Sequence, residues 1–172
     1  MIWTAPPVDR AADVLLASEA DHLRGVLDFH RATLLRKCAG LTGEQLARKP
    51  LPTTNLSLLG LIRHMAKVER TWFRVLFRCE ALDTLYSTPG WRDADFEDLD
   101  PAHAEADYGR LIEESELARK AVASASLDDE FTFPDQDVAS LRYVYLQVIA
   151  EYARHNGHAD LIRQAIDGTT GI

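Results

Sequence analysis

The stretch SLRYVYLQVIAEYARHNGHADLIRQAIDG, residues 140–168, decides which fold this chain of 172 residues can adopt. Its apolar residues recur at steps of three and four, which is the spacing of one face of an α-helix. That face consists of Leu141, Val144, Tyr145, Val148, Tyr152, His155, Ile162 and Ile166. Ser140 is a typical N-cap, and Gly168 is typical of a residue that ends a helix. We therefore predict one long amphipathic helix over residues 140–167.

Three further segments show the same helical periodicity. They cover residues 11–39, 57–78 and 101–125. Gly40 is the expected end of the first helix, and Ser57 is the expected N-cap of the second. Asp100 opens the third as its N-cap, with Pro101 in the first turn. Four amphipathic helices and no long β-alternation predict an all-α four-helix bundle, with residues 1–172 forming a single domain.

The segments between these helices read as connectors. Residues 42–49 allow a short extra turn before Pro50 and Pro52 break the chain. Residues 79–100 are acidic and aromatic and are best described as a long loop, and loops of that length often cover a functional site. Residues 128–137 form a second acidic connector.

Composition excludes several classes of protein. Acidic residues outnumber basic ones by 27 to 19, and the net charge of -8 repels phosphate backbones, so we expect no nucleic-acid partner. The N-terminus lacks a basic start followed by an apolar run, and no stretch reaches the roughly 20 apolar residues of a membrane span. Cys38 and Cys79 are isolated from each other. These features predict a cytoplasmic protein with reduced thiols and no membrane partner.

Polar residues on the inward faces are the candidates for chemistry. Glu151, His155 and His158 are spaced i, i+4 and i+7 and so share one helix face. This face is continuous with the apolar residues Val144 and Val148 that precede it in the sequence. An ionised carboxylate is costly to bury unless a cation or strong donors meet it. His64 lies within the apolar stripe of the second helix. Ligands on two helices of a bundle can converge on a metal ion, and imidazole with carboxylate suits zinc, nickel, iron or manganese.

Each of these residues also has a simpler explanation. His64 can be a hydrogen-bonded core histidine, and Glu151 can form a salt bridge with Arg154 or Arg63. His158 can be a surface residue, a partner that orients a ligand, or the third ligand in place of Glu151. His30 also lies in an apolar stripe, which runs from Leu16 through Leu34 to Cys38, yet no residue pairs with it by spacing. The residues themselves leave these alternatives open.

Gly157 is a further clue within the fourth helix. Glycine in a helix interior costs about 1 kcal/mol relative to alanine. The close approach of a neighbouring helix or of a bound ligand would explain its presence.

Two stretches of the sequence carry a resemblance to a known family. Residues 57–70, SLLGLIRHMAKVER, are similar to the second helix of the DinB/YfiT-like superfamily, in which a histidine is a metal ligand. Residues 151–157 are similar to its fourth-helix motif, commonly His-x-x-x-His-Arg-Gly-Gln. Alignment on the glycine places His155 on the second histidine, Glu151 on the first and His158 at the glutamine, which is normally no ligand. The glutamate departs from the commonest pattern but matches the variant of mycothiol-dependent maleylpyruvate isomerase.

The resemblance extends over residues 19–168, and a subgroup of unknown function shares the run RHNGHADLIR. It implies a divalent metal ion held by His64, Glu151 and His155, with zinc and nickel as first candidates and iron and manganese next. It further implies a homodimer in which a low-molecular-weight thiol binds at the metal as a thiolate, for S-transfer to an electrophilic substrate or for isomerisation. The excess of arginine over lysine favours mycothiol as that thiol.

The alternative is a non-catalytic metal- or ligand-binding dimeric bundle with a stress or sensing role. No catalytic base beyond a metal-bound water or thiol is assigned. Arg63 and Arg154 neighbour the ligands in sequence, but adjacent helix positions face different directions, so neither receives a role.

Overall fold

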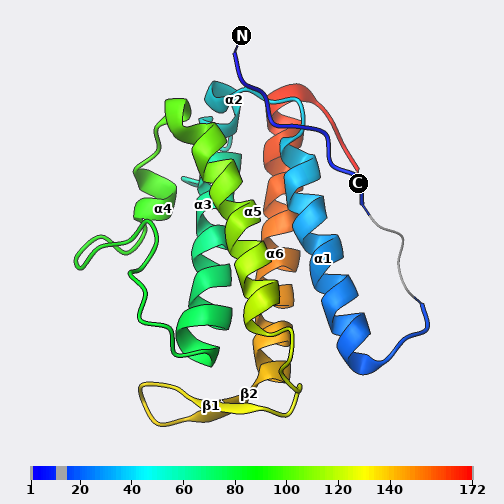
Figure 1. The fold of residues 1–172 in the computed structure, drawn as a ribbon. Coiled ribbons are helices and arrows are strands. Elements are labelled where there is room, and N and C mark those ends of the chain that lie inside the picture. Colours follow the sequence, from blue (N-terminus) through cyan, green and yellow to red (C-terminus); the bar gives the residue numbers. More distant parts are fainter. Residues whose placement is uncertain (1, 11–14, 172) are drawn as a thin grey trace.

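The computed structural model describes residues 2–10 and 15–171, and its four long helices lie side by side as a bundle (Figure 1). These helices are α1 (Glu19–Cys38), α3 (Leu58–Glu69), which continues directly into the π-helix η1 (Arg70–Phe77), α5 (Ala104–Ala121) and α6 (Leu141–Asp167). α1 packs mainly against α6, and α3 packs mainly against α5. The predicted all-α four-helix bundle is confirmed.

Capping residues set several helix ends where the sequence predicted them. The Ser57 hydroxyl accepts a hydrogen bond from the Gly60 amide, and the Ser140 hydroxyl accepts one from the Tyr143 amide. Gly168 adopts the left-handed conformation, φ 80°, that ends α6. These three ends are local features, which explains why they could be predicted without a structure.

The start of the first helix was predicted too early. Residues 11–14 lie outside the described part of the chain, and α1 begins only at Glu19. Ser18 is the N-cap, because its hydroxyl accepts a hydrogen bond from the amide of Asp21, and the acidic first turn suits the positive end of the helix dipole. Leu16 is 93% exposed and so does not belong to the buried stripe.

The connectors contain more regular structure than the sequence predicted. The extra turn over residues 42–49 is the helix α2 (Gly43–Ala47), and the predicted loop over residues 79–100 contains the helix α4 (Ala94–Glu97). A 3-10 helix, η2 (Pro101–His103), precedes α5, which ends at Ala121 rather than near residue 125.

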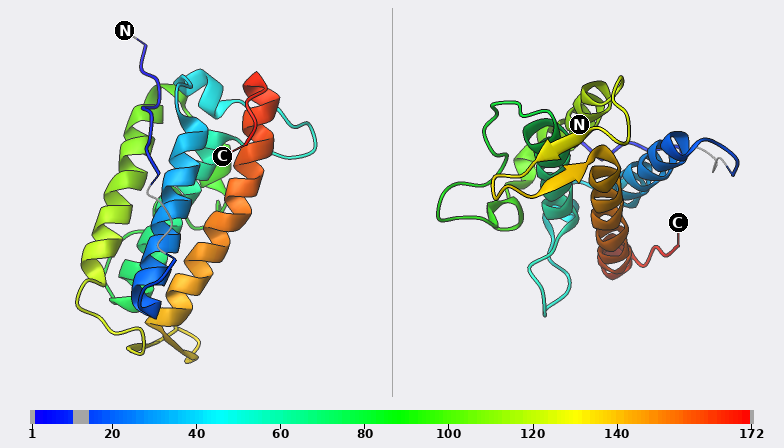
Figure 2. Two further views of the ribbon diagram at one scale, coloured as in Figure 1. Left: turned by 90° about the vertical axis from the view of Figure 1, so that its right-hand side faces the viewer. Right: turned by 90° about the horizontal axis from the view of Figure 1, so that it is seen from below.

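The second acidic connector is a β-hairpin. Strands β1 (Glu130–Thr132) and β2 (Val138–Ser140) pair in antiparallel register, and Figure 2 shows the hairpin across the lower end of the bundle. Phe131 is buried, and its ring packs edge-on to that of Phe77 at a centroid distance of 6.0 Å. Strands of three residues are too short to show an alternating pattern, so the prediction of no sheet was wrong here.

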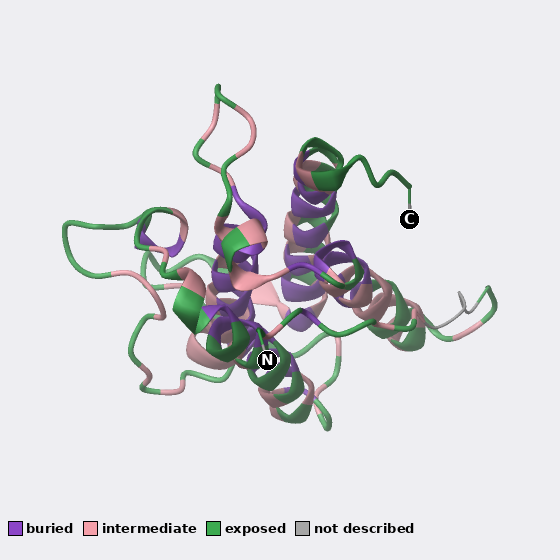
Figure 3. Cartoon of the chain, turned by 90° about the horizontal axis from the view of Figure 1, so that it is seen from above, coloured by how far each residue is buried: buried purple, intermediate pink, exposed green. Residues whose placement is uncertain are grey.

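Glu69 and Glu114 are buried between the helices of the bundle, whose inward faces are the buried parts of the helices in Figure 3. Glu69 accepts two hydrogen bonds of 2.7 Å from Arg31 and one of 2.9 Å from the Tyr152 hydroxyl. Glu114 of α5 accepts hydrogen bonds from Arg70 and Arg74 of η1. The ion pairs join α1 and α5 to the α3–η1 helix, and the Tyr152 hydrogen bond joins α6 to it.

Candidate metal site

His64 on α3 and the pair Glu151 and His155 on α6 come together at one place between the two helices. One ligand atom from each residue can be chosen so that all three atoms lie within 4.8 Å of one another. Glu151 Oε2 is 3.4 Å from His155 Nε2 and 3.9 Å from His64 Nε2. The side chains are 11% (His155), 19% (His64) and 27% (Glu151) exposed. The three side chains are therefore close together and each is partly exposed to solvent.

The charge states of the α6 residues suit a cation. Burial, together with a smaller effect of the nearby His64 ring, lowers the pKa of His155 from 6.5 to about 4, so this imidazole is neutral at pH 7 and offers a lone pair. Burial alone would raise the pKa of Glu151, but the hydrogen bond and charge of Arg154, with smaller contributions from the two histidines, bring that pKa below its ordinary value. The site thus presents an ionised carboxylate beside a neutral imidazole.

The sequence offered Arg154 and Arg63 as salt-bridge partners for Glu151, and only Arg154 contacts it. Arg154 donates a 2.7 Å hydrogen bond to Glu151 Oε1, which leaves Oε2 directed at the histidines. Arg63 points away from the site, where it pairs with Asp107 and donates to the carbonyl of Ala94. The salt bridge to Arg154 therefore coexists with the inward position of the other carboxylate oxygen.

His158 lies behind His155 rather than beside the other two donors. Its Nδ1 is 3.3 Å from Nδ1 of His155, on the ring edge opposite the nitrogen that faces Glu151. The sequence left three roles open for His158. Its position fits the role of a partner that orients a candidate ligand, here His155.

The structure bears on two other residues that the sequence singled out. A Cβ added at Gly157 would meet no atom of the described chain within 4 Å, so no neighbouring helix approaches this glycine. His30 does have a partner, because Asn156 Nδ2 lies 3.3 Å from His30 Nδ1 and donates to the His30 carbonyl. Spacing along one helix could not reveal this contact, because it joins residues 126 positions apart.

Asp95 on α4 is a residue of this site that sequence reasoning missed. It is fully buried, and its Oδ2 lies 2.9 Å from His64 Nδ1 and 2.5 Å from Lys67 Nζ. Burial alone would raise the pKa of Asp95, but the hydrogen bonds and charges of His64 and Lys67 lower it overall. The only sequence signal was the acidic loop long enough to cover a site, and nothing in it singled out Asp95 among its other carboxylates.

The residues present fit a divalent metal ion. A tetrahedral site with bonds of 2.0–2.2 Å places its ligand atoms about 3.3 Å apart. The separations from Glu151 Oε2 are 3.4 and 3.9 Å, and all three ligand atoms lie within 4.8 Å of one another, so side-chain movements of about 1 Å or less bring them to that value. Two imidazole nitrogens and one carboxylate oxygen suit zinc and its neighbours in the first transition series, and three protein ligands leave a position open.

Comparisons with known proteins bear on the whole chain. In the described part of the structure, no helix is both long and apolar enough to cross a membrane. Neither the curated proteins nor the solved structures contain a significant match. A family model described as mycothiol-S-transferase matches residues 22–168, which confirms the placement in the DinB/YfiT-like superfamily and includes all three residues of the candidate site. The chain therefore belongs to the mycothiol-S-transferase family.

Proposed function

We propose that this protein is a metal-dependent enzyme that joins mycothiol through its sulfur to an electrophilic small molecule, with the ion held by His64, Glu151 and His155. The convergence of three donor atoms within 4.8 Å of one another carries the metal part of the proposal. The family match over residues 22–168 supports the thiol part. Zinc and nickel fit the donor set best, and iron or manganese would also be accepted by it.

The side chains of the chain have distinct tasks in this proposal. His155 is neutral and provides Nε2, while Glu151 contributes the one negative charge of the ligand set. Arg154 holds the other oxygen of Glu151, so that the carboxylate keeps one orientation. The ring of Phe96 lies 4.9 Å from that of His64 and forms an apolar wall there.

An ion held by two neutral imidazoles and one carboxylate keeps a net positive charge, and it would supply the Lewis acidity that favours the thiolate form of a thiol at neutral pH. A thiol held in this form would need no general base from the side chains of the chain. The same chemistry would serve an isomerisation in which the thiol adds and later leaves.

The test combines metal analysis with a transfer assay. The purified protein is loaded separately with zinc, nickel, iron or manganese and supplied with mycothiol and a fluorogenic alkylating probe as electrophile. We expect conjugation that falls by more than about 100-fold in His64→Ala and His155→Ala, beyond the usual effect of losing an outer partner of a metal ligand, with metal content falling in parallel. Glu113→Gln, on the exposed surface of α5, is the matched control.

Equal metal content in the wild type and both histidine variants would rule out the site. Turnover with none of mycothiol, bacillithiol and glutathione would rule out transfer. Binding of metal and thiol without turnover would support the non-catalytic module instead.

We further propose that the protein acts as a homodimer through the outward face of α6. This face carries exposed apolar and small residues in a stripe at helical spacing: Tyr143, Leu146, Ala150, Ala153, Gly157 and Leu161. A contiguous exposed apolar stripe is typical of an interface, and a partner helix against it would explain the glycine at 157. Light scattering during gel filtration tests this proposal, with Leu146→Glu and Leu161→Glu expected to yield monomers.

A further inference from the structure

We infer that Asp95 is a positioning residue of the metal site, which holds the His64 ring in the tautomer and orientation that present Nε2 to the ion. The inference rests on the proposed function insofar as it assumes that a metal binds at His64. The juxtaposition that carries it is a fully buried carboxylate of α4 placed 2.9 Å from His64 Nδ1, the ring nitrogen that faces away from Glu151.

The direction of the hydrogen bond fixes the tautomer. An ionised carboxylate can only accept, so the Asp95–His64 hydrogen bond requires a proton on Nδ1 of His64. In a neutral ring the other nitrogen then carries the lone pair, and Nε2 of His64 is the nitrogen that lies toward Glu151. Ligands of metal ions commonly have such a carboxylate behind the imidazole, which fixes both tautomer and ring orientation.

The ring of His64 is also held from its face. Its centroid lies 4.9 Å from that of Phe96, the residue that follows Asp95 on α4. Adjacent residues of one short helix thus hold the ring edge and the ring face. Because the His64 ring is restricted at both its edge and its face, it loses little further conformational freedom when an ion binds.

α4 is itself fixed to α3 by a set of contacts along one helix face. Arg63 donates a 3.2 Å hydrogen bond to the Ala94 carbonyl, and Lys67 contacts both Asp95 and the Arg92 carbonyl. Gly60 lies beneath Phe96, where an added Cβ would be 3.0 Å from Phe96 Cδ1 and 3.4 Å from Phe96 Cα. Residues 60, 63, 64 and 67 have the i, i+3, i+4, i+7 spacing of a single face. Asp95 is therefore held in place by backbone contacts and not by its own side chain alone.

The role of Asp95 is mainly geometric. Lys67 lies on the same oxygen as His64, so it offsets much of the carboxylate charge that would otherwise reach the ring. Asparagine at this position keeps a side-chain oxygen that can accept from Nδ1, whereas alanine keeps none. The inference therefore predicts different results for these two substitutions.

The first experiment measures zinc affinity of the full chain by competition with a chromophoric chelator. We expect Asp95→Ala to weaken zinc binding by about 10- to 100-fold and Asp95→Asn to weaken it less. Glu97→Gln is the matched control, since Glu97 lies on α4 but bonds to Trp91. An affinity in Asp95→Ala within twofold of that of the wild type would overturn the inference. If the wild type itself binds none of zinc, nickel, iron and manganese, the proposed function fails instead.

The second experiment needs no metal. Long-range proton–nitrogen correlation spectra of the metal-free protein report which nitrogen of His64 carries the proton. We expect Nδ1–H in the wild type and in Asp95→Asn, and a shift toward Nε2–H in Asp95→Ala, because Nε2–H is the usual tautomer of an unconstrained ring. A merely structural role of Asp95 would leave the tautomer unchanged, and Nε2–H in the wild type would contradict the inference regardless of zinc binding.

Discussion

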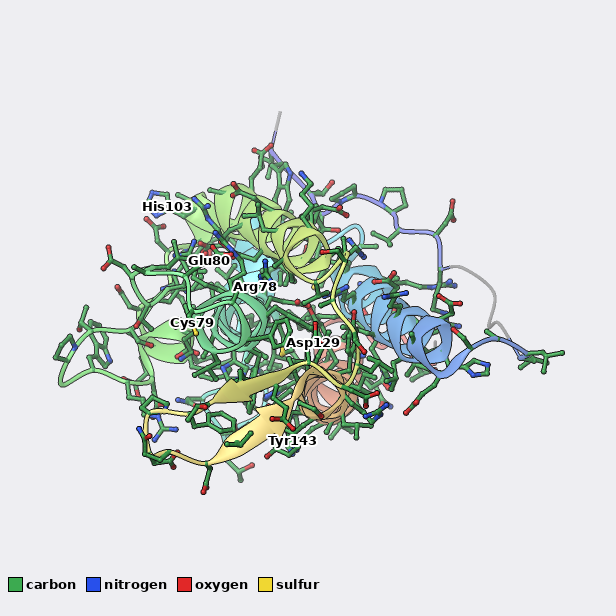
Figure 4. All side chains as sticks on the ribbon, turned by 60° about the horizontal axis from the view of Figure 1, so that its bottom comes forward. Arg78, Cys79, Glu80, His103, Asp129 and Tyr143 are labelled. Carbon is green, nitrogen blue, oxygen red and sulfur yellow. The ribbon has the colours of Figure 1, made fainter. Side chains whose placement is uncertain are left out.

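The two cysteines have opposite surroundings. Cys38 is fully buried in α1, and burial raises the pKa of its thiol to about 12, so it is protonated and inaccessible at neutral pH. Cys79 is exposed just beyond η1, where Figure 4 shows it near Arg78 and Glu80. We predict that Ellman's reagent modifies one thiol per native chain at pH 8 and two in denaturant. Cys79→Ser should abolish the native reaction, and two thiols of equal native reactivity would disprove this assignment.

His155 makes stability depend on pH. Burial, assisted by the His64 ring and opposed by Glu151, lowers its pKa from 6.5 to about 4 in the folded protein. The unfolded chain therefore binds a proton first as pH falls, so the contribution of His155 is fully present above about pH 6.5 and declines toward pH 4. We predict that chelator-treated protein loses about 2 kcal/mol of unfolding free energy from this group between pH 7 and pH 5.

Urea unfolding at the two pH values measures this loss. His155→Gln should decline less over the same range, because glutamine does not titrate. Equal losses in the wild type and in His155→Gln would assign the pH dependence to other groups.

At the scale of elements, the Arg31–Glu69 pair connects α1 to α3 inside the bundle. Both side chains are buried, and removing one partner of such a pair leaves the other charge without compensation. We predict that Glu69→Leu lowers the unfolding free energy by about 3–5 kcal/mol, whereas Arg31→Met combined with Glu69→Leu costs much less. Urea unfolding of the single and double variants measures both effects. A double variant that is less stable than Glu69→Leu would show that the pair stabilises the fold by more than mutual neutralisation.

For the whole molecule, a bound ion would join α3 to α6. Binding to the folded state alone adds about 4 kcal/mol at a free metal concentration near 1,000 times Kd. For a chain of this size we predict that a strong chelator lowers the melting temperature by about 10 °C. Differential scanning calorimetry with and without zinc measures the change, and His64→Ala should not respond to the metal. An unchanged melting temperature in the wild type would exclude a stabilising ion.

The parts of the fold that could be predicted from the sequence depend on local signals. The periodic stripe of α6 and the caps at Ser57, Ser140 and Gly168 depend on residues within one or two turns of each other, and the structure confirms them. The start of α1 was misplaced because apolar residues such as Leu16 continue a helical spacing in a segment that the Ser18 cap excludes from the helix.

The sequence by itself determined the four-helix bundle and the candidate residues His64, Glu151 and His155. Both the residue spacing and the motif resemblance can be recognised within the sequence of a single helix. Only the tertiary structure decided that Asp95 lies behind His64 and that His158 lies behind His155. The Asp95 contact spans 31 residues and depends on how a connector folds over α3. Hydrogen bonds between distant segments are selected by the packing of the whole core, and no periodicity within one segment encodes them.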